Sequence, residues 1–364
     1  MQFENSKGAL FIMINKNLLE NKTKSFKHST QNIVPFPKSI FSKLINKSIE
    51  IVTVPKPDEP SINQANVGII LDEKLIFKIL SEHYKEVLIT EITTKKDLAE
   101  LAIRKPDLVF SGVKYFYFNN KKIWLNDYLE LNDILYIASS KSSLLKESNK
   151  SRAKKIMQKS NITTSEFFTT EPGEHKNEKK IPITFPLFIK PITGGDSRGI
   201  DKNSIAYNYS SYKKKVSEIK KNQHSRCLVE KYLSGKEYSV GIFKDNITGM
   251  IEAMPIEIIV EKNVNGHHIL DFDVKKNDEE KVIAVLNVKI FKRLSVLAKK
   301  SFIALKGKSF GRIDFKMDHL GNPHFIEANL MPGIRKGYFY RSCLLNLNIN
   351  YEEMILKITA NGLH

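Results

Sequence analysis

The stretch "GRIDFKMDHLGNPHFIEANLMPGI", residues 311–334, constrains the fold more than any other part of the chain. Two segments that alternate apolar and polar residues flank "HLGN", in which Gly321 and Asn322 suit a tight turn. The pattern predicts an antiparallel hairpin. If the turn is centred just before Gly321, Asp314 lies directly opposite Glu327. Two like charges that face each other are unfavourable, so a cation must neutralise them.

The alternation of side chains assigns the rest of the hairpin to two faces. Asn329 shares a face with Glu327, and Arg312 shares one with Asp314. Apolar residues point the other way, towards a core: Ile313, Phe315 and Ile326. Two carboxylates and an amide on one rigid hairpin are oxygen ligands that suit Mg²⁺ beside a nucleotide. The alternative is an exposed polar face, in which the pairing is a coincidence of register.

The first half of the chain alternates strand and helix patterns, which predicts a parallel sheet. The predicted strands are residues 49–54, 86–92 and 107–112, the helices are 71–84 and 95–105, and a further helix and strand occupy 126–139. The second half predicts helices at 148–162, 283–305 and 350–363, with strands at 183–190, 226–243 and 251–260. A length of 364 residues fits two or three domains.

Composition narrows the class of protein. The net charge of +18 favours anionic partners such as nucleotides, nucleic acid or acidic substrates, although scattered lysines also simply solvate a surface. Cys227 and Cys343 form no disulfide or zinc pattern. No apolar run approaches the roughly 20 residues of a membrane span, and "GALFIMI" (8–14) is too short for a signal sequence, so we expect a cytoplasmic protein. Residues 1–47 read as a polar, Lys-rich appendage.

Two upstream motifs suit a nucleotide. Lys190 ends a strand, and the "TGGDSRG" that follows lets backbone N–H groups approach phosphate oxygens, with Ser197 adding a hydroxyl. The loop lacks the Walker A pattern. In "LVEKYLSGKE", a strand that leaves its sheet offers backbone groups to an adenine edge, and Glu237 could accept hydrogen bonds from ribose. Lys150 and Lys275 are further phosphate candidates. Each motif taken alone also fits a solvated surface.

The order and spacing of these elements resemble the ATP-grasp superfamily, specifically the D-alanine–D-alanine ligase family, over about residues 48–364. The resemblance implies an α/β (α+β) ATP-grasp fold with three α/β domains and ATP between two antiparallel sheets. The predicted layout is an N-terminal extension (1–47), an α/β domain (48–146), a central lid subdomain (147–235) and a C-terminal domain with the metal site (236–364).

The resemblance also implies roles for individual residues. The phosphate contacts would be Lys150, Lys190, Lys275, Gly195 and Ser197. The adenine edge would meet Glu230, Lys231 and Leu233, largely through backbone, and Glu237 would bind ribose. Two Mg²⁺ ions, with Mn²⁺ as an alternative, would be held by Asp314, Glu327 and Asn329. Arg312 and the backbone N–H of Gly333 would stabilise the oxyanion, with Lys275 at the γ-phosphate.

The substrate half departs from the family pattern. Asp196 replaces the first of two serines in the phosphate loop, and Lys276 replaces a tyrosine after Lys275. A Ser/His-rich turn that binds the second substrate's carboxylate is replaced by residues 334–338, which include Arg335, Lys336 and Tyr338. Residues 51–60 lack the family's Gly-rich loop, and "SGVKYFYF" (111–118) replaces its "HG" motif. We expect Asp196 to hold a cationic group, and Arg335 and Lys336 to meet a carboxylate or a larger anion.

The sequence therefore predicts an ATP-dependent carboxylate–amine ligase that acts through an acylphosphate on an amino acid or peptide other than two D-alanines. Its partners would be small-molecule substrates, with no nucleic acid and no membrane; a homodimer is left open. One alternative is a D-alanine–D-alanine ligase of cell-wall synthesis. Another is a non-catalytic nucleotide-binding regulator, which the complete Asp/Glu/Asn set disfavours. Charge alone suggests a nucleic-acid-binding protein.

Overall fold

The computed structural model describes residues 44–55, 65–67, 71–195, 197–262 and 266–364. The predicted N-terminal appendage up to residue 43, the "GALFIMI" run and Asp196 lie outside these ranges, as does the side chain of Lys276. Residues Leu44–His364 form one compact unit. In these ranges no helix is both long enough and apolar enough to span a bilayer.

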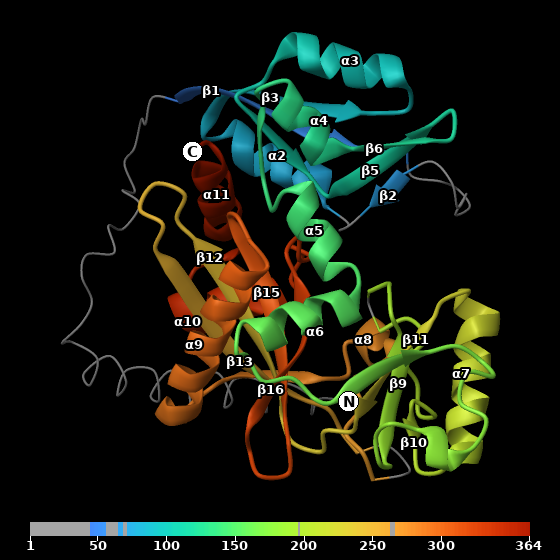
Figure 1. Cartoon of the computed structure of the whole chain (residues 1–364). Helices are drawn as coiled ribbons and strands as arrows, with labels where there is room; N and C mark the ends of the chain where they lie inside the picture. The colour runs from blue at the N-terminus through green and yellow to red at the C-terminus, as the bar shows by residue number, and fades with distance from the viewer. Residues whose placement is uncertain (1–43, 56–64, 68–70, 196, 263–265) are drawn as a thin grey trace, which may run out of the picture. The chain divides into compact units, whose positions relative to one another are not determined.

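The predicted parallel sheet is present, with the strand order β3-β1-β4-β7 (Figure 1). Its strands are β1 (Ile45–Thr53), β3 (Tyr84–Glu91), β4 (Leu108–Ser111) and β7 (Leu135–Tyr136), joined by α2 (Glu73–Ser81), α3 (Lys95–Arg104) and α4 (Leu125–Leu131). Helix α3 begins where the sequence predicts because Thr94 and Asp97 form a capping box. It ends where Lys105 adopts a left-handed conformation.

An aromatic hairpin follows β4, where the sequence analysis predicted no strands. Strands β5 (Val113–Phe118) and β6 (Lys121–Trp124) pair with each other, and β5 also pairs with β2 (Ala65–Val67). The "VKYFYF" run is rich in residues that favour strands, and Asn119 and Asn120 both have the positive φ of a tight hairpin turn. The hairpin therefore occupies the place where the family resemblance implied an "HG" motif.

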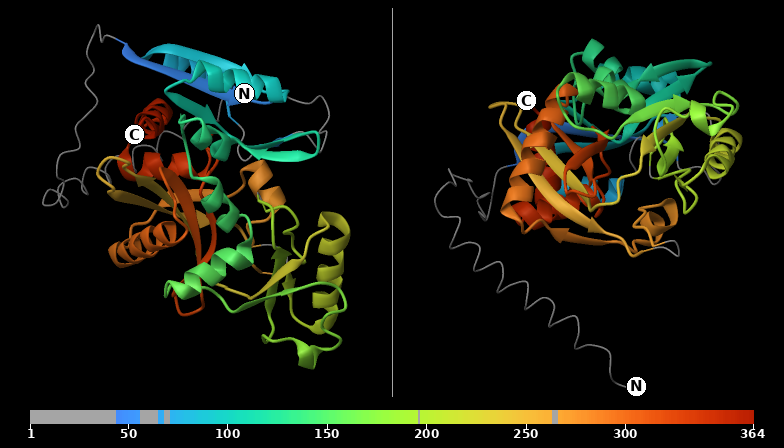
Figure 2. Two further views of the ribbon diagram at one scale, coloured as in Figure 1. Left: turned by 45° about the horizontal axis from the view of Figure 1, so that its top comes forward. Right: turned by 60° about the horizontal axis from the view of Figure 1, so that its bottom comes forward.

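The second sheet has four strands, in the order β10-β9-β11-β8. Its elements are β8 (Phe167–Thr170), β9 (Leu187–Pro191), β10 (Ile205–Ala206), β11 (Cys227–Lys231), the short helix η1 (Glu178–Lys180) and helix α7 (Tyr209–Gln223). Helix α7 covers one face of the sheet, as Figures 1 and 2 show. Apolar side chains of the sheet and of α7 form one buried cluster there. The opposite face therefore carries the polar side chains of β9 and β11.

A further sheet has five strands, in the order β14-β13-β12-β15-β16. Its strands are β12 (Glu237–Lys244), β13 (Ile251–Ile259), β14 (Lys281–Ala284), β15 (Phe310–Met317) and β16 (Pro323–Asn329). The accompanying helices are α8 (Phe272–Asn277), α9 (Val288–Ala304), α10 (Tyr338–Leu347) and α11 (Tyr351–Gly362). Side chains on one face of β12 and β15 join α9 in the main core, among them Val240, Ile313 and Phe302.

The β15–β16 hairpin has the predicted pairing but not the predicted turn. Asp314 is the partner of Glu327, which is confirmed. The connecting loop, however, spans residues 318–322 and is centred on Leu320, and a β-bulge at Ile326 restores the register. The prediction that Ile326 points to the core is wrong. The bulge turns Ile326 to the same side as Glu327, where both line a cleft.

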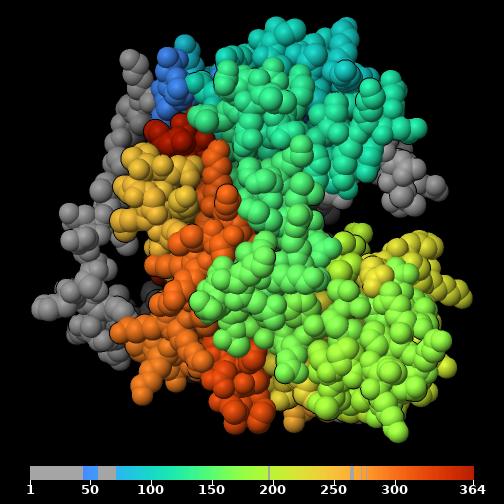
Figure 3. All heavy atoms as spheres, in the orientation of Figure 1, coloured from blue at the N-terminus to red at the C-terminus, as the bar shows by residue number. Residues whose placement is uncertain are grey.

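Helices α5 (Lys141–Glu147) and α6 (Lys150–Lys159) connect the layers. Asn149 caps α6, as predicted for the basic helix in this region. In the space-filling view the green residues of α5 and α6 lie against the orange β15–β16 hairpin and α9, which are far away in sequence (Figure 3). Helices α5 and α6 therefore pack directly against the hairpin that carries the predicted metal ligands.

The joint between β11 and β12 gives a stability prediction. A Cβ added at Gly235 would lie 2.7 Å from the carbonyl oxygens of both Met317 and Asp318. Gly235→Ala should lower the free energy of unfolding in denaturant by about 1–3 kcal/mol, because backbone atoms must move to admit the methyl group. At Gly195 an added Cβ meets nothing within 4 Å, so Gly195→Ala is the control. Equal stability of the two variants would contradict this account of the joint.

Candidate active site

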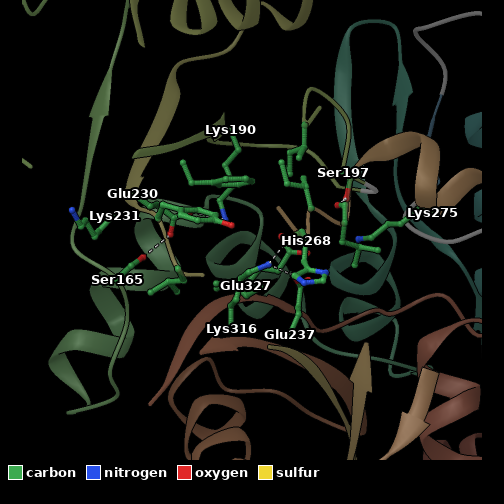
Figure 4. A pocket seen from close by; sticks show the side chains of 17 residues that line it. Ser165, Lys190, Ser197, Glu230, Lys231, Glu237, His268, Lys275, Lys316 and Glu327 are labelled. Carbon is green, nitrogen blue, oxygen red and sulfur yellow. Dashed lines mark hydrogen bonds and ion pairs between the residues drawn. The ribbon is translucent and has the colours of Figure 1, made fainter. Parts of the chain in front are cut away.

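A cleft of about 640 Å³, including its part open to solvent, lies between the four-stranded and the five-stranded antiparallel sheets. Figure 4 shows Lys190, Lys275, Glu327, Glu237 and Ser197 arranged around it. The full lining is Ser165, Phe188, Lys190, Ser197, Ile200, Glu230, Lys231, Tyr232, Leu233, Glu237, His268, Ile269, Leu270, Lys275, Lys316, Ile326 and Glu327.

A buried charge network forms one wall. Lys190 and Glu230 share a face of the β9–β11 pair, and their charged atoms are 2.7 Å apart. Glu230 also binds the ammonium of Lys154, which is fully buried in α6. Burial alone would raise the pKa of Glu230, but the charges of the two lysines lower it to about 2. The side chain of Glu230 therefore holds Lys190 in place, whereas the resemblance implied a mainly backbone role for this residue.

The Gly-rich loop is tied to two other segments. The Lys150 ammonium donates to the carbonyl oxygen of Gly194 at 2.5 Å. Ser197, which has a φ of +56°, donates to the carbonyl oxygen of Leu270 at 3.0 Å. Gly195 is exposed between them. Lys150 is buried, and this burial lowers the pKa of its ammonium group. Two predicted phosphate contacts, Lys150 and Ser197, thus flank the loop, while Asp196 lies outside the described residues.

The cleft lining also includes apolar and aromatic side chains. Leu233 is among them, together with residues that the sequence analysis missed: Phe188, Ile200, Tyr232, Ile269, Leu270 and Ile326. A signal for Phe188 was available, because it shares a strand face with Lys190. The ammonium of Lys231 instead donates to the carbonyl oxygens of Thr184 and Phe185, so it points away from the cleft (Figure 4).

Glu237 lies at the rim of the cleft in an ion pair with Lys316, at 2.9 Å. Lys316 also donates to the carbonyl oxygen of His268. The pairing follows from register, since the two residues are direct partners across β12 and β15. Lys316 therefore orients the carboxylate of Glu237, the group predicted to bind ribose.

The carboxylate of Asp314 is held by two neighbours. Arg312 donates to it through Nε at 3.0 Å and through Nη2 at 2.9 Å. Ser239, its partner across β12, donates at 2.6 Å. Burial would lower the pKa of Arg312, but the charge of Asp314 and its hydrogen bonds raise it. The guanidinium is therefore charged and fixed in direction.

Glu327 faces Asp314 without a direct ion pair or hydrogen bond from any described residue. Burial alone would raise its pKa, but the charges of Lys150, Lys275, Lys190 and Arg312 lower it to about 2. Asn329, the partner of Arg312, accepts from the backbone N–H of Met331 at 3.3 Å. The described residues contain no cluster of three His, Cys, Asp or Glu side chains fit for a metal. Two opposed carboxylates and an amide oxygen still fit a hard cation that shares its remaining ligands with phosphate or water.

The loop after β16 carries the predicted substrate residues. Gly333, Arg335 and Lys336 are exposed, whereas Tyr338 is buried. Arg335 lies near the carbonyl oxygen of Leu71, at 3.5 Å. The Tyr338 hydroxyl donates to Glu280 at 2.6 Å. The structure thus divides this group into two exposed cations and one buried aromatic ring.

A buried carboxylate anchors the start of the same loop. Glu147, at the end of α5, accepts from the backbone N–H of Leu330 and forms an ion pair with Lys114 at 3.1 Å. Sequence reasoning missed both charged residues, because the contact joins three segments that no local pattern relates. The loop that carries Gly333 is therefore fixed from the side of the aromatic hairpin.

This arrangement, with a cleft between two antiparallel sheets and a parallel-sheet unit before them, is the ATP-grasp fold. Two solved structures of D-alanine–D-alanine ligase from Bacillus anthracis share the fold. One matches with a TM-score of 0.68 at 21% identity, over 87% of this chain and 97% of that chain. The other, complexed with ATP, matches with a TM-score of 0.62 at 19% identity and the same coverage.

The family model for the D-ala D-ala ligase C-terminus matches residues 156–360, more than half of the chain, so the chain belongs to this family. A D-alanine–D-alanine ligase from Aquifex aeolicus is 29% identical over 265 residues, which are 72% of this chain and 84% of that protein. D-alanine–D-alanine ligase B from Clostridium perfringens is 26% identical over 240 residues, 65% and 75% of the two chains. The protein is therefore an ADP-forming ligase of the ATP-grasp class, as predicted.

The buried network gives a second prediction. Glu230→Gln leaves Lys154 and Lys190 without their carboxylate and should destabilise the fold by about 3–5 kcal/mol. Because the pKa of Glu230 falls from 4.5 to about 2 in the folded protein, its stabilisation is present above pH 4.5 and is lost as the pH falls towards 2. The free energy of unfolding should therefore vary less with pH in the variant over this window. The exposed Glu178→Gln is the control, and a variant that keeps the wild-type slope would contradict the assignment.

Proposed function

We propose that this protein joins a carboxylate and an amine, with ATP as the energy source, and that its substrates are not two D-alanines. The observation that carries the proposal is the convergence of Lys150, Lys190, Lys275 and Arg312 on the half-buried carboxylate Glu327. Such a group of cations suits a transferring phosphoryl group, whose charge is spread over its oxygens.

In the proposed reaction the substrate carboxylate oxygen attacks the γ-phosphorus of ATP, the bond to the β-phosphate oxygen breaks, and ADP leaves. The amine then attacks the acylphosphate carbon. Phosphate leaves with the C–O bonding electrons, and the ammonium proton passes to solvent. Arg312 and the backbone N–H of Gly333 stabilise the oxyanion of the tetrahedral intermediate. Lys275 and Lys190 bind the phosphate oxygens that gain charge.

We assign Mg²⁺ to Asp314, Glu327 and Asn329. When bound, the cation would neutralise phosphate charge and polarise the transferring group. The fit rests on Glu327, whose lowered pKa keeps it ionised and which has no direct partner among the described residues. Asp314 contributes an oxygen already oriented by Arg312 and Ser239.

Two observations support substrates other than two D-alanines. The turn that binds a carboxylate in the family pattern carries Tyr338, whose hydroxyl is already used by Glu280. The cations nearby, Arg335 and Lys336, are exposed on the loop and suit an anionic group that extends beyond a single small amino acid.

The substrate prediction is tested by measuring phosphate release with ATP, Mg²⁺ and pairs of amino acids, short peptides and small carboxylates, followed by mass determination of products. We expect D-alanine alone to give less than about a tenth of the rate of the best pair, since a polar group left unpaired at a substrate site costs about 1–3 kcal/mol and a factor of ten corresponds to about 1.4 kcal/mol. Efficient formation of D-alanyl-D-alanine would contradict the proposal and establish the dipeptide ligase.

The metal assignment is tested with Glu327→Gln, which removes the charge and keeps the shape. We expect turnover to fall by about 100-fold or more, and the Mg²⁺ concentration needed for half-maximal nucleotide binding to rise, because a charged oxygen ligand is lost. Glu86→Gln, on an exposed position of β3, is the matched control. Near-normal turnover of Glu327→Gln at low Mg²⁺ would show that the assignment is wrong.

A further inference from the structure

The ring of Tyr338 lies against two of the cations assigned to the reacting centre. The guanidinium carbon of Arg312 is 5.3 Å from the ring centroid, and the Lys275 ammonium nitrogen is 5.8 Å from it. Both distances are within the reach of cation–π attraction. The Tyr338 ring therefore lies beside one cation of β15 and one of α8, two elements that are far apart in the sequence.

The ring is held from behind. Its hydroxyl donates to Glu280 at 2.6 Å, and Tyr338 belongs to a buried apolar cluster with Ile256, Ile258 and Leu270. Burial and the hydrogen bond to Glu280 raise the pKa of Tyr338, so the phenol stays protonated and remains a donor. Tyr338 is the first residue of α10, so its backbone is fixed by the helix.

Burial of the Glu280 carboxylate costs free energy. It is 7% exposed, and its second oxygen, Oε2, has no hydrogen-bond partner in the described part of the chain. A buried acceptor that is left unpaired costs free energy, but an apolar residue in its place would leave the buried Tyr338 hydroxyl without an acceptor. The carboxylate therefore anchors the Tyr338 hydroxyl.

The guanidinium of Arg312 is thereby restrained on two sides. Asp314 binds its Nε and Nη2 along one edge, and its carbon lies over the Tyr338 ring. Its Nη1 makes no hydrogen bond to any residue in the described ranges and is left for a reacting group. A planar donor that is bound along one edge and lies over an aromatic ring has little freedom to move.

We propose that Tyr338, held by Glu280, is a positioning residue for the ligase reaction: its ring fixes the plane of Arg312 and the location of the Lys275 ammonium relative to each other. The proposal rests on the proposed function, because the two cations are assigned to the reacting centre there. Preorganised charges lower a barrier without further rearrangement, so loss of the ring should reduce kcat more than it raises the KM for ATP.

The test compares three variants by kcat and KM for ATP, on the substrate pair that gives the most phosphate release. Tyr338→Phe keeps the π face but loses the hydroxyl that Glu280 binds, and should lose about 3-fold in kcat, whereas Tyr338→Met fills the space without a π face and should lose about 10-fold or more. Glu280→Gln keeps an acceptor for the hydroxyl and should lie closer to wild type than Tyr338→Phe. Equal kcat values for Tyr338→Met and wild type would overturn the proposal.

A second readout needs no substrate. Phenylglyoxal modifies accessible arginines, and mass spectrometry can follow Arg312 and the exposed Arg335 in the same sample. Arg312 should be modified several-fold faster in Tyr338→Met than in wild type and Tyr338→Phe, while Arg335 should not change. Unchanged Arg312 reactivity in a folded Tyr338→Met protein would contradict the positioning role. If wild type turns over no substrate pair, the proposed function fails, and the labelling still decides whether Tyr338 positions Arg312.

Discussion

The arrangement of the whole site depends on two carboxylates that face each other across β15 and β16. Asp314 and Glu327 are direct partners, and their repulsion has to be offset before the hairpin is stable. On one side Arg312 binds Asp314 edge-on. On the other side lysines from three separate segments lower the pKa of Glu327. The cations that neutralise the hairpin therefore come from segments that are far apart in the sequence.

One of those lysines is itself held by an anion. Lys190 is paired with Glu230, which also binds the buried Lys154. The cleft therefore contains charges of both signs rather than a single positive patch, and Lys190 is already oriented by its partner. Preorganised charges of this kind suit phosphoryl transfer, in which the protein supplies position and electrostatic stabilisation rather than a nucleophile.

The sequence was sufficient for many of the strands and helices and for the central pairing, and it failed at the aromatic hairpin, where the backbone is irregular and where distant segments meet. The opposition of Asp314 and Glu327 was predicted with a turn that is off-centre, and the bulge at Ile326 compensates for it. The same bulge lets Phe325 enter the core although Glu327, two residues on, faces the cleft. Lys154 reads as one more lysine on a basic helix, and nothing local relates Glu280 to Tyr338. The roles of Asp196 and Lys276 stay predictions.

The central claim is that the two antiparallel sheets bind one nucleotide between them. Hydrogen–deuterium exchange, measured with and without Mg²⁺ and a non-hydrolysable ATP analogue, tests it on the full chain. The account predicts slower exchange on both sides of the cleft, in β9 and β11 of the four-stranded sheet and in β15 and β16 of the five-stranded sheet, with no change in β1 and β3. Protection confined to one side, or found in the parallel sheet instead, would contradict it.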